Sequence, residues 1–148
     1  MKDLSIEIII PTWNGRDLLE KNLPAVFTAY EYLRTEKKKI TVIDDGSSDD
    51  SVVFVISHYP SIHVITSRIN RGFHAAVNRA VSESIADVVV LLNNDMQPAP
   101  EAFDTLYVPF LWNKELFAVT GRIYAADKKT FLYGNRGGIF KYGHFFLK

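Results

Sequence analysis

Asp87-Val88-Val89-Val90-Leu91-Leu92-Asn93-Asn94-Asp95 is the stretch of sequence that decides the fold. The apolar run Val88–Leu92 is mostly β-branched, which predicts a strand covered on both faces. The run then ends abruptly in two amides and a carboxylate. In an open α/β sheet the ligand crevice lies at the carboxyl ends of the strands, so Asp95 is predicted to lie where a buried strand opens onto a site. The alternative is an ordinary Asn/Asp turn that continues through Pro98 and Pro100.

The rest of the chain alternates between strand and helix patterns. Four more apolar runs are predicted as strands: Ile6–Ile10, Ile40–Ile43, Ile62–Thr66 and Leu116–Gly121. Apolar residues recur at helical spacing between them, which predicts helices over Arg16–Leu33, after Ser48, over Phe73–Ser84 and after Pro100. Pro24 and Pro109 fall inside two of these helices, where we expect a kink or a break. This alternation predicts a doubly wound α/β fold, with a mainly parallel sheet and helices on both faces.

The last part of the chain has a different character. It is aromatic, punctuated by glycine and only weakly periodic. Gly137-Gly138, between Tyr133 and Phe140, is a candidate hairpin turn. We therefore divide the chain into an α/β domain over residues 1–125 and an irregular extension over residues 126–148.

Composition excludes several classes of protein. The 148 residues include 17 basic and 17 acidic side chains, so no basic excess favours nucleic acid as a partner. Cysteine is absent, which excludes disulfides and thiolate metal sites and fits a reducing compartment. No signal-peptide pattern is present, and no window reaches the ~18 apolar residues that a membrane span needs. We expect a cytoplasmic protein; a place at the inner face of the membrane would require parts beyond these residues.

Polar clusters follow three of the predicted strands: Pro11-Thr12-Trp13-Asn14, Asp44-Asp45-Gly46-Ser47 and Asn93-Asn94-Asp95. A parallel sheet would bring all three to one edge. Carboxylates at that edge suggest a divalent cation, which could neutralise a nucleotide diphosphate. The three-glycine dinucleotide fingerprint and the phosphate loop ending in Gly-Lys-Ser/Thr are both absent, so phosphate binding would depend on the metal.

Four segments together resemble the family-two inverting glycosyltransferases of the GT-A fold: Ile8–Asn14, Val42–Ser51, Asn70–Asn78 and Leu91–Pro98. Their order and spacing carry the resemblance, and the Asn-Arg-Gly-Phe and Asn-Asn-Asp forms are most similar to the rhamnosyltransferase-like branch. The resemblance implies transfer of a sugar from a UDP- or dTDP-sugar to an acceptor hydroxyl. It also implies Mg²⁺ or Mn²⁺ as cofactor, a carbohydrate or lipid-linked acceptor, and a role in polysaccharide or glycoconjugate synthesis.

The resemblance also implies roles for individual residues. Asp95 is implied as the metal ligand, and because Asn93 replaces the first Asp of the family's motif, Asp95 alone would carry the charge. Contacts with the nucleotide sugar are implied for Pro11, Thr12, Asn14, Asp44, Asp45, Arg71, Gly72, Asn93 and Asn94.

No catalytic base is identified. The family's base lies past the fifth strand, and none of the later acidic residues matches its motif: Glu101, Asp104, Glu115 and Asp127. We therefore expect the donor-binding part of a larger enzyme, which binds the nucleotide diphosphate but does not transfer sugar efficiently.

Three other classes share the doubly wound fold. A receiver-like signalling module would need an acidic pair after the first strand, where this chain has Pro11-Thr12. A nucleotidyltransferase would need a basic, glycine-rich loop there, and Arg16 is the only basic residue. A non-catalytic nucleotide-binding or assembly module remains open, because no base is identified.

Overall fold

The computed structural model describes residues 3–125, 127, 129–134, 138–141 and 144–147. The chain forms two compact units, Met1–Lys114 and Glu115–Lys148. The first holds a four-stranded sheet with its helices, and the second holds two short strand pairs. The functional division into residues 1–125 and 126–148 stays a prediction. Among the described residues, no helix has both the length and the apolar character to span a membrane.

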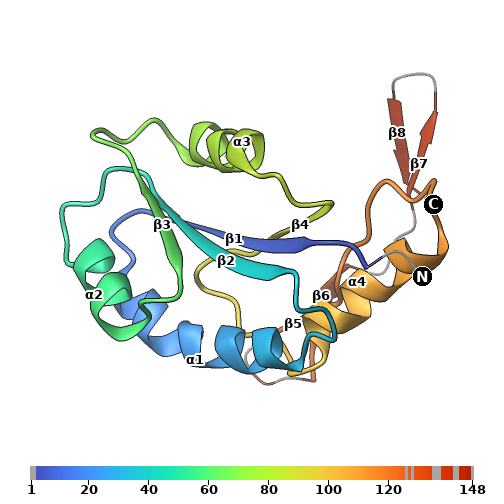
Figure 1. The fold of residues 1–148 in the computed structure, drawn as a ribbon, viewed down its shortest axis with the longest axis horizontal. Coiled ribbons are helices and arrows are strands. Elements are labelled where there is room, and N and C mark those ends of the chain that lie inside the picture. Colours follow the sequence, from blue (N-terminus) through green and yellow to red (C-terminus); the bar gives the residue numbers. More distant parts are fainter. Residues whose placement is uncertain (1–2, 126, 128, 135–137, 142–143, 148) are drawn as a thin grey trace. The chain divides into compact units, whose positions relative to one another are not determined.

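The first unit is a parallel sheet with helices on both faces (Figure 1). The strand order is β3-β2-β1-β4, and each neighbouring pair is parallel. The predicted doubly wound α/β fold is thus confirmed. The elements are β1 (Ile6–Thr12), α1 (Arg16–Tyr32), β2 (Lys38–Asp44), α2 (Ser51–His58), β3 (His63–Thr66), α3 (Phe73–Glu83), β4 (Val88–Leu91) and α4 (Ala102–Trp112).

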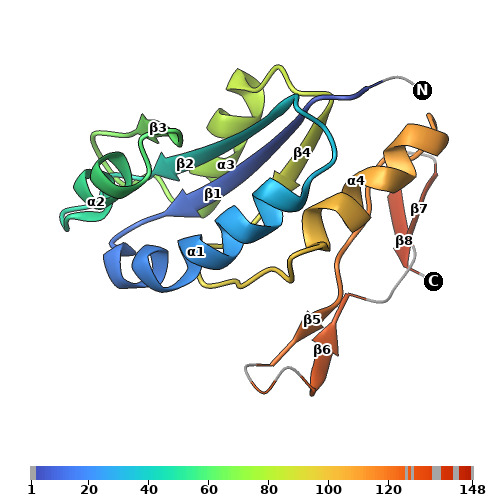
Figure 2. The same ribbon diagram turned by 60° about the horizontal axis from the view of Figure 1, so that its bottom comes forward.

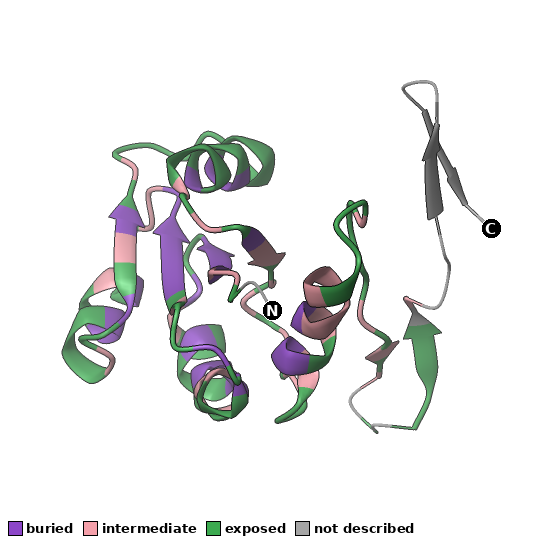
Figure 3. Ribbon diagram, turned by 45° about the vertical axis from the view of Figure 1, so that its right-hand side comes forward, coloured by how far each residue is buried: buried purple, intermediate pink, exposed green. Residues whose placement is uncertain are grey.

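The core is built on β1, whose seven residues are all buried. Successive strand residues point to opposite faces of the sheet. Ile6, Ile8 and Ile10 accordingly pack with residues of α1, α2 and α4, whereas Ile9 packs with residues of α3. Figure 2 shows α1 on one side of the sheet and α3 on the other. In Figure 3 the buried residues of this unit gather in the sheet and on the helix sides that face it.

Glu7, the second residue of this core strand, is a buried carboxylate on the α3 side of the sheet. It accepts hydrogen bonds from the hydroxyls of Thr41 and Ser84, and Lys39 Nζ lies 3.2 Å from its Oε1. Burial raises the pKa of Glu7, but the hydrogen bonds from Ser84, Thr41 and Lys39 outweigh it, so this pKa lies below the ordinary value. Glu7 is therefore held as a charged group within the core.

The Val88–Leu92 strand is covered on both faces only in part, which corrects the prediction of a fully buried strand: Val89 packs on the α3 side, and Val88, Val90 and Leu92 pack on the opposite side. Val88 is buried, Val89 and Val90 are half-buried, and Leu91 is 55% exposed. Among the described strands β4 pairs only with β1, so it lies at an edge of the sheet. The helices on each face cover this edge strand only in part, and an apolar run in the sequence cannot show how far such distant segments reach.

The predicted fifth strand over Leu116–Gly121 is also wrong, because none of these residues is in a strand and Phe117 is 78% exposed. The second unit instead pairs β5 (Ile123–Tyr124) with β6 (Phe131–Tyr133), and β7 (Gly138–Lys141) with β8 (His144–Leu147), both antiparallel. Each strand therefore finds a partner close to it in sequence. Gly138 begins β7 and Gly137 lies outside the described residues, so the expected hairpin between Tyr133 and Phe140 is not the observed pairing.

Neither internal proline breaks its helix. α1 runs from Arg16 to Tyr32 through Pro24, and α4 runs from Ala102 to Trp112 through Pro109. Both helices bury apolar residues in the core. The free energy gained by this burial exceeds the cost of the backbone hydrogen bond that each proline removes.

Candidate functional site

The carboxyl ends of three strands meet around Thr12, the last residue of β1. Thr12 is paired with Asp44 of β2, and its carbonyl accepts the backbone N–H of Asp45 at 2.9 Å. From the opposite side, Asn94 Nδ2 donates to Thr12 Oγ1 at 3.0 Å. Thr12 and Asp44 are both buried, at 4% and 3% exposure. The structure thus brings the three predicted polar clusters to one edge of the sheet.

Asp44 has one carboxylate oxygen in use and one without a partner. Its Oδ2 accepts the backbone N–H of Ser47 at 3.2 Å. Its Oδ1 is buried and has no hydrogen-bond partner in the part of the chain that the structure describes. A buried acceptor left unpaired costs about 1–3 kcal/mol, so such groups are rare in folded proteins. Asp44 Oδ1 is therefore a buried acceptor that still lacks an N–H or O–H donor.

Asp45, in contrast, has both of its carboxylate oxygens engaged by backbone N–H groups of the chain. Both of its oxygens lie 3.1 Å from the backbone nitrogen of Arg71, and Oδ2 accepts the Gly72 N–H at 2.7 Å. Gly72 has a φ of 90°, a left-handed conformation that favours glycine. Gly46 also has a positive φ, and a Cβ there would lie 2.7 Å from the backbone of Ile69. Asp45 therefore holds the loop before α3 closely against the turn that follows β2.

The loop after β4 presents one free carboxylate. Asn93 and Asp95 are exposed, whereas Asn94 is half-buried by its bond to Thr12. Asp95 makes no hydrogen bond or ion pair with any described residue, which leaves both of its oxygens free for a cation. Gly15 packs against the Asn94–Thr12 contact so closely that a Cβ would lie 2.4 Å from both polar atoms. The loop is thus anchored while Asp95 remains in solvent.

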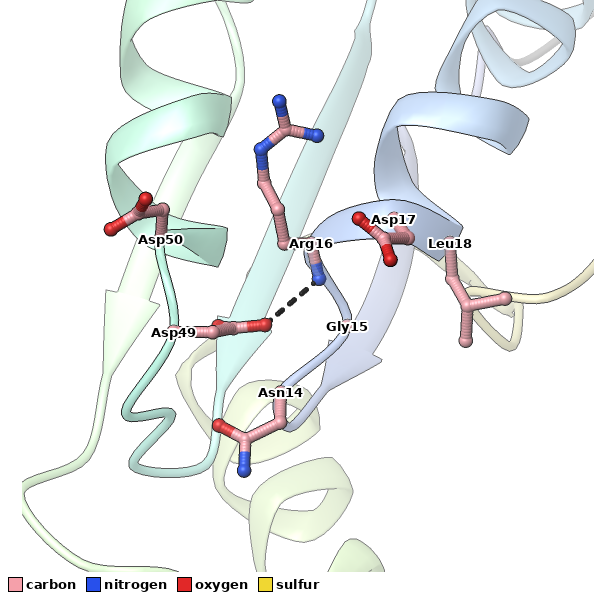
Figure 4. A pocket seen from close by; sticks show the side chains of 7 residues that line it. All are labelled: Asn14, Gly15, Arg16, Asp17, Leu18, Asp49 and Asp50. Atoms are coloured by element: carbon pink, nitrogen blue, oxygen red, sulfur yellow. Dashed lines mark hydrogen bonds between the residues drawn. The ribbon is translucent and has the colours of Figure 1, made fainter.

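An open cavity of about 590 Å³ lies at the start of α1, beside this edge (Figure 4). A helix N-terminus can bind phosphate through its free N–H groups. Part of this end is already used: the N–H of Arg16, the first helical residue, donates to Asp49 Oδ2, and just before the helix the N–H of Asn14 donates to Ser47 Oγ and that of Gly15 to Ser51 Oγ. The cavity is lined by Asn14, Gly15, Arg16, Asp17, Leu18, Asp49 and Asp50.

The charges of this cavity also disfavour phosphate. Burial raises the pKa of Asp49, but hydrogen bonds from Ser51 and from the Arg16 backbone hold that pKa below its usual value. With Asp17 and Asp50 beside it, the cavity carries negative charge that repels a diphosphate. Asn14 faces the β2–α2 loop, where its Oδ1 accepts the Ser48 N–H at 2.8 Å. The negative charge of this cavity therefore makes it a poor place for a phosphate group.

A family model described as glycosyl transferase family 2 matches residues 7–147. This chain belongs to glycosyl transferase family 2. The undecaprenyl-phosphate 4-deoxy-4-formamido-L-arabinose transferase of Sodalis glossinidius (strain morsitans) is 33% identical over 110 residues, which cover 72% of this chain and 33% of that protein. The narrower placement in the rhamnosyltransferase-like branch stays a prediction.

Solved structures of glycosyltransferases share the fold. The mannosyltransferase PcManGT from Pyrobaculum calidifontis, in complex with GDP-Man and Mn²⁺, has a TM-score of 0.68 at 20% identity, over 84% of this chain and 37% of its own. The glucosyl-3-phosphoglycerate synthase from Mycobacterium tuberculosis, in complex with Mn²⁺, UDP and glucosyl-3-phosphoglycerate, has a TM-score of 0.63 at 19% identity. The match covers 84% of this chain and 46% of that chain. The family 2 chain thus has the GT-A fold and spans less than half the length of these relatives.

The oxygen donors of this family 2 chain fit a divalent cation that binds together with its nucleotide. No group of three or more His, Cys, Asp or Glu side chains that could hold a metal is found among the described residues. Mg²⁺ needs no such group, because it is usually bound by one or two carboxylates together with waters and substrate phosphates. The exposed Asp95 carboxylate, with the Asn93 amide two residues before it, provides a donor set of this kind.

Two of the later acidic residues of this family 2 chain are engaged by neighbouring residues. Asp104 accepts hydrogen bonds from Arg34 Nε at 2.8 Å and Nη2 at 2.6 Å, and Arg34 lowers the pKa of Asp104. Asp127 accepts from Thr130 and from the Lys129 N–H, and the Thr130 hydroxyl lowers the pKa of Asp127. Carboxylates held in this way are weak bases. Neither residue is therefore suited to deprotonate an acceptor.

Sequence reasoning missed one polar residue of the site. Asn22 is 3% exposed in α1 and hydrogen-bonds to the loop that carries Asp95. A signal was present, because Asn22 stands three residues after Leu19 and four before Val26, on the helix's apolar face.

Proposed function

We propose that this chain is the donor-binding part of a glycosyltransferase that moves a sugar from a UDP- or dTDP-sugar to an acceptor hydroxyl. The observation that carries the proposal is the buried, unpartnered Oδ1 of Asp44 at the carboxyl end of β2. The imide N–H of uracil or thymine is a donor of the kind that this oxygen lacks. A hydrogen bond to a charged acceptor in a dry pocket would fix the base and favour donors that carry an imide.

The neighbouring residues would complete the nucleotide pocket. Pro11 and Thr12 are buried beside Asp44 and would form its wall. Asp45 would act through the loop it holds, presenting the Arg71 side chain and the Gly72 backbone to the donor. Arg71 is exposed and forms no ion pair with any described residue, so its guanidinium is available to the diphosphate. Asn93, Asn94 and Asn14 would shape the rim.

Asp95 would hold Mg²⁺ or Mn²⁺. When bound, this cation would neutralise the negative charge that develops on the leaving nucleoside diphosphate. Thr12, through Asn94, would keep this carboxylate at a fixed distance from the base pocket. The family resemblance implies direct displacement at the anomeric carbon with inversion. Two solved structures of this fold carry Mn²⁺ with a nucleotide or nucleotide sugar, which supports a metal-bound donor.

We further propose that this stretch binds its donor without efficient transfer, because Asp104 and Asp127 are engaged and no other base is identified. The relative from Sodalis glossinidius acts on undecaprenyl phosphate, as its name states. This supports a lipid-linked acceptor, glycoconjugate synthesis and a place in the cytoplasm at the inner face of the membrane. Robust sugar transfer by these 148 residues would contradict the proposed lack of a base.

A metal-dependent nucleotide titration tests the proposed donor site. UDP, dTDP and GDP are titrated with and without Mn²⁺, by calorimetry or thermal shift, into the parent chain, Asp95→Ala and Glu101→Ala. A ligand at 100 times its Kd stabilises the fold by about 2.7 kcal/mol, which is readily measured. We expect a Mn²⁺-dependent response to the pyrimidine nucleotides that Asp95→Ala loses and the exposed control Glu101→Ala keeps. An equal response in Asp95→Ala would mean that this carboxylate is only a turn residue.

A further inference from the structure

Asn22 is a polar residue on an otherwise apolar face of α1. Its side chain is buried among Ile10, Leu19, Leu23 and Val26, on the side of the helix that faces the sheet. A buried amide is costly unless its donor and acceptor are both satisfied. The sequence nevertheless places an amide here, where a leucine would add to the core. The partners of the Asn22 amide therefore indicate what it does.

Both ends of the Asn22 side chain contact the loop after β4. Nδ2 donates to the backbone carbonyl of Asn94 at 2.9 Å, and Oδ1 accepts from Gln97 Nε2 at 2.9 Å. These two loop residues stand on either side of Asp95. The gap between Asn22 and the loop has no room for water, so the contact is direct. One buried amide thus clamps the loop on both sides of an exposed carboxylate.

The clamp is continuous with the strand ends beside Asp44. Asn94, which receives the Asn22 hydrogen bond on its carbonyl, donates through its side chain to Thr12 Oγ1 at 3.0 Å. Thr12 is in turn paired with Asp44. A chain of contacts therefore runs from Asn22 through Asn94 to Thr12, whose strand pairs with the strand that ends in Asp44.

We propose that Asn22 is a positioning residue, which sets the place of the Asp95 carboxylate relative to the Asp44 pocket so that one metal-bound nucleotide diphosphate can reach both. The inference rests on the proposed function and deepens it. Asn22 touches neither nucleotide nor metal in this scheme. Its effect is therefore expected on the metal-dependent part of binding, whereas the contact of the base with Asp44 is expected to persist.

The test variant is Asn22→Leu, with Lys21→Ala as its matched control. Leucine has nearly the same shape as asparagine and suits the apolar neighbours, so the variant removes the two hydrogen bonds without opening a cavity. Lys21 is exposed and adjacent on the same helix. For each protein, UDP affinity is measured by calorimetry in EDTA, and the Mn²⁺ concentration that gives half of the metal-dependent response is measured at fixed UDP. Hydrogen–deuterium exchange of the peptide over residues 92–99 reports on the loop without any ligand.

We expect Asn22→Leu to raise the Mn²⁺ midpoint at least fivefold while metal-free UDP affinity stays within twofold of the parent chain. Exchange in residues 92–99 should rise, with β1 and β2 unchanged. The proposal is overturned if the Mn²⁺ midpoint stays within twofold, or if metal-free and metal-dependent binding fall equally, which is what general destabilisation would produce. If the parent chain itself fails to bind UDP with Mn²⁺, the proposed function fails first. Unchanged loop exchange in Asn22→Leu would then reject the clamp independently.

Discussion

Asp45→Ala should both destabilise the fold and weaken nucleotide binding, although Asp45 is not expected to touch the base. The carboxylate accepts from the backbone N–H groups of Arg71 and Gly72, at distances of 2.7 to 3.1 Å. Alanine removes both acceptor oxygens and releases the loop from the turn after β2. The loop can then leave the pocket edge that Asp44 shares with it.

The size of the effect follows from the number of donors lost. A hydrogen bond to a charged acceptor contributes about 1.5–3 kcal/mol, so two donors give a gross value of about 3–6 kcal/mol. Arg71 and Gly72 are exposed, and water can satisfy their N–H groups in the variant. The net loss should therefore lie near the low end, at about 2–3 kcal/mol. For a chain of this length each kcal/mol lowers Tm by about 2–4 °C, so a loss of about 2–3 kcal/mol lowers Tm by about 4–12 °C.

Thermal unfolding of Asp45→Ala, Asp45→Asn and Asp50→Ala measures this loss. Asparagine keeps one acceptor oxygen and should lose about half as much as alanine. Asp50 is exposed in the same turn, and its side chain makes no cap hydrogen bond, so its replacement should cost no more than about 0.5 kcal/mol. If Asp45→Ala and Asp50→Ala unfold at the same Tm, the loop does not depend on the Asp45 carboxylate, which would contradict the role given to it here.

Two further substitutions test the core strand and the packing of the edge. Glu7→Gln should cost about 1–2 kcal/mol at pH 7, because it weakens charge-assisted bonds with Lys39, Thr41 and Ser84. The folded-state pKa of Glu7 lies below its ordinary value of 4.5, so the contribution is full above that pH and is lost as pH falls below it. Urea unfolding should therefore show the two proteins converging in acid, and a constant difference would contradict this. Gly15→Ala should lower the free energy of unfolding by about 1–3 kcal/mol, because the added Cβ overpacks the sheet edge. The substitution should also weaken UDP binding, measured by calorimetry. Stability and affinity equal to those of the parent chain would show that the edge tolerates a Cβ.

The parallel sheet could be predicted because its signals are local. Runs such as Ile6–Ile10 and Ile40–Ile43 lie within β1 and β2, and the polar residues that follow them end the strands. The meeting of Thr12, Asp44 and Asn94 at one edge then follows from parallel topology alone. Periodicity could not show that β4 is an edge strand, because that depends on a neighbour far away in the sequence.

The different roles of Asp44 and Asp45 could not be predicted from the local sequence pattern. Asp44 and Asp45 are the same residue type in succession, yet one has a free oxygen and the other holds a loop. Consecutive residues at a strand end point in different directions, so the loop before α3 could reach only one of them. Asn22 was missed for a similar reason, since its partners lie more than seventy residues away.

The central claim is that the buried oxygen of Asp44 receives an N–H from the nucleotide base. Calorimetric titration with UDP and with N3-methyl-UDP, at one Mn²⁺ concentration, tests it directly. The methyl group replaces the imide proton, so the base loses its N–H donor and cannot approach the oxygen closely. The account predicts that the parent chain binds UDP at least tenfold more tightly, a difference of about 1.4 kcal/mol or more. Equal affinity for the two nucleotides would contradict it.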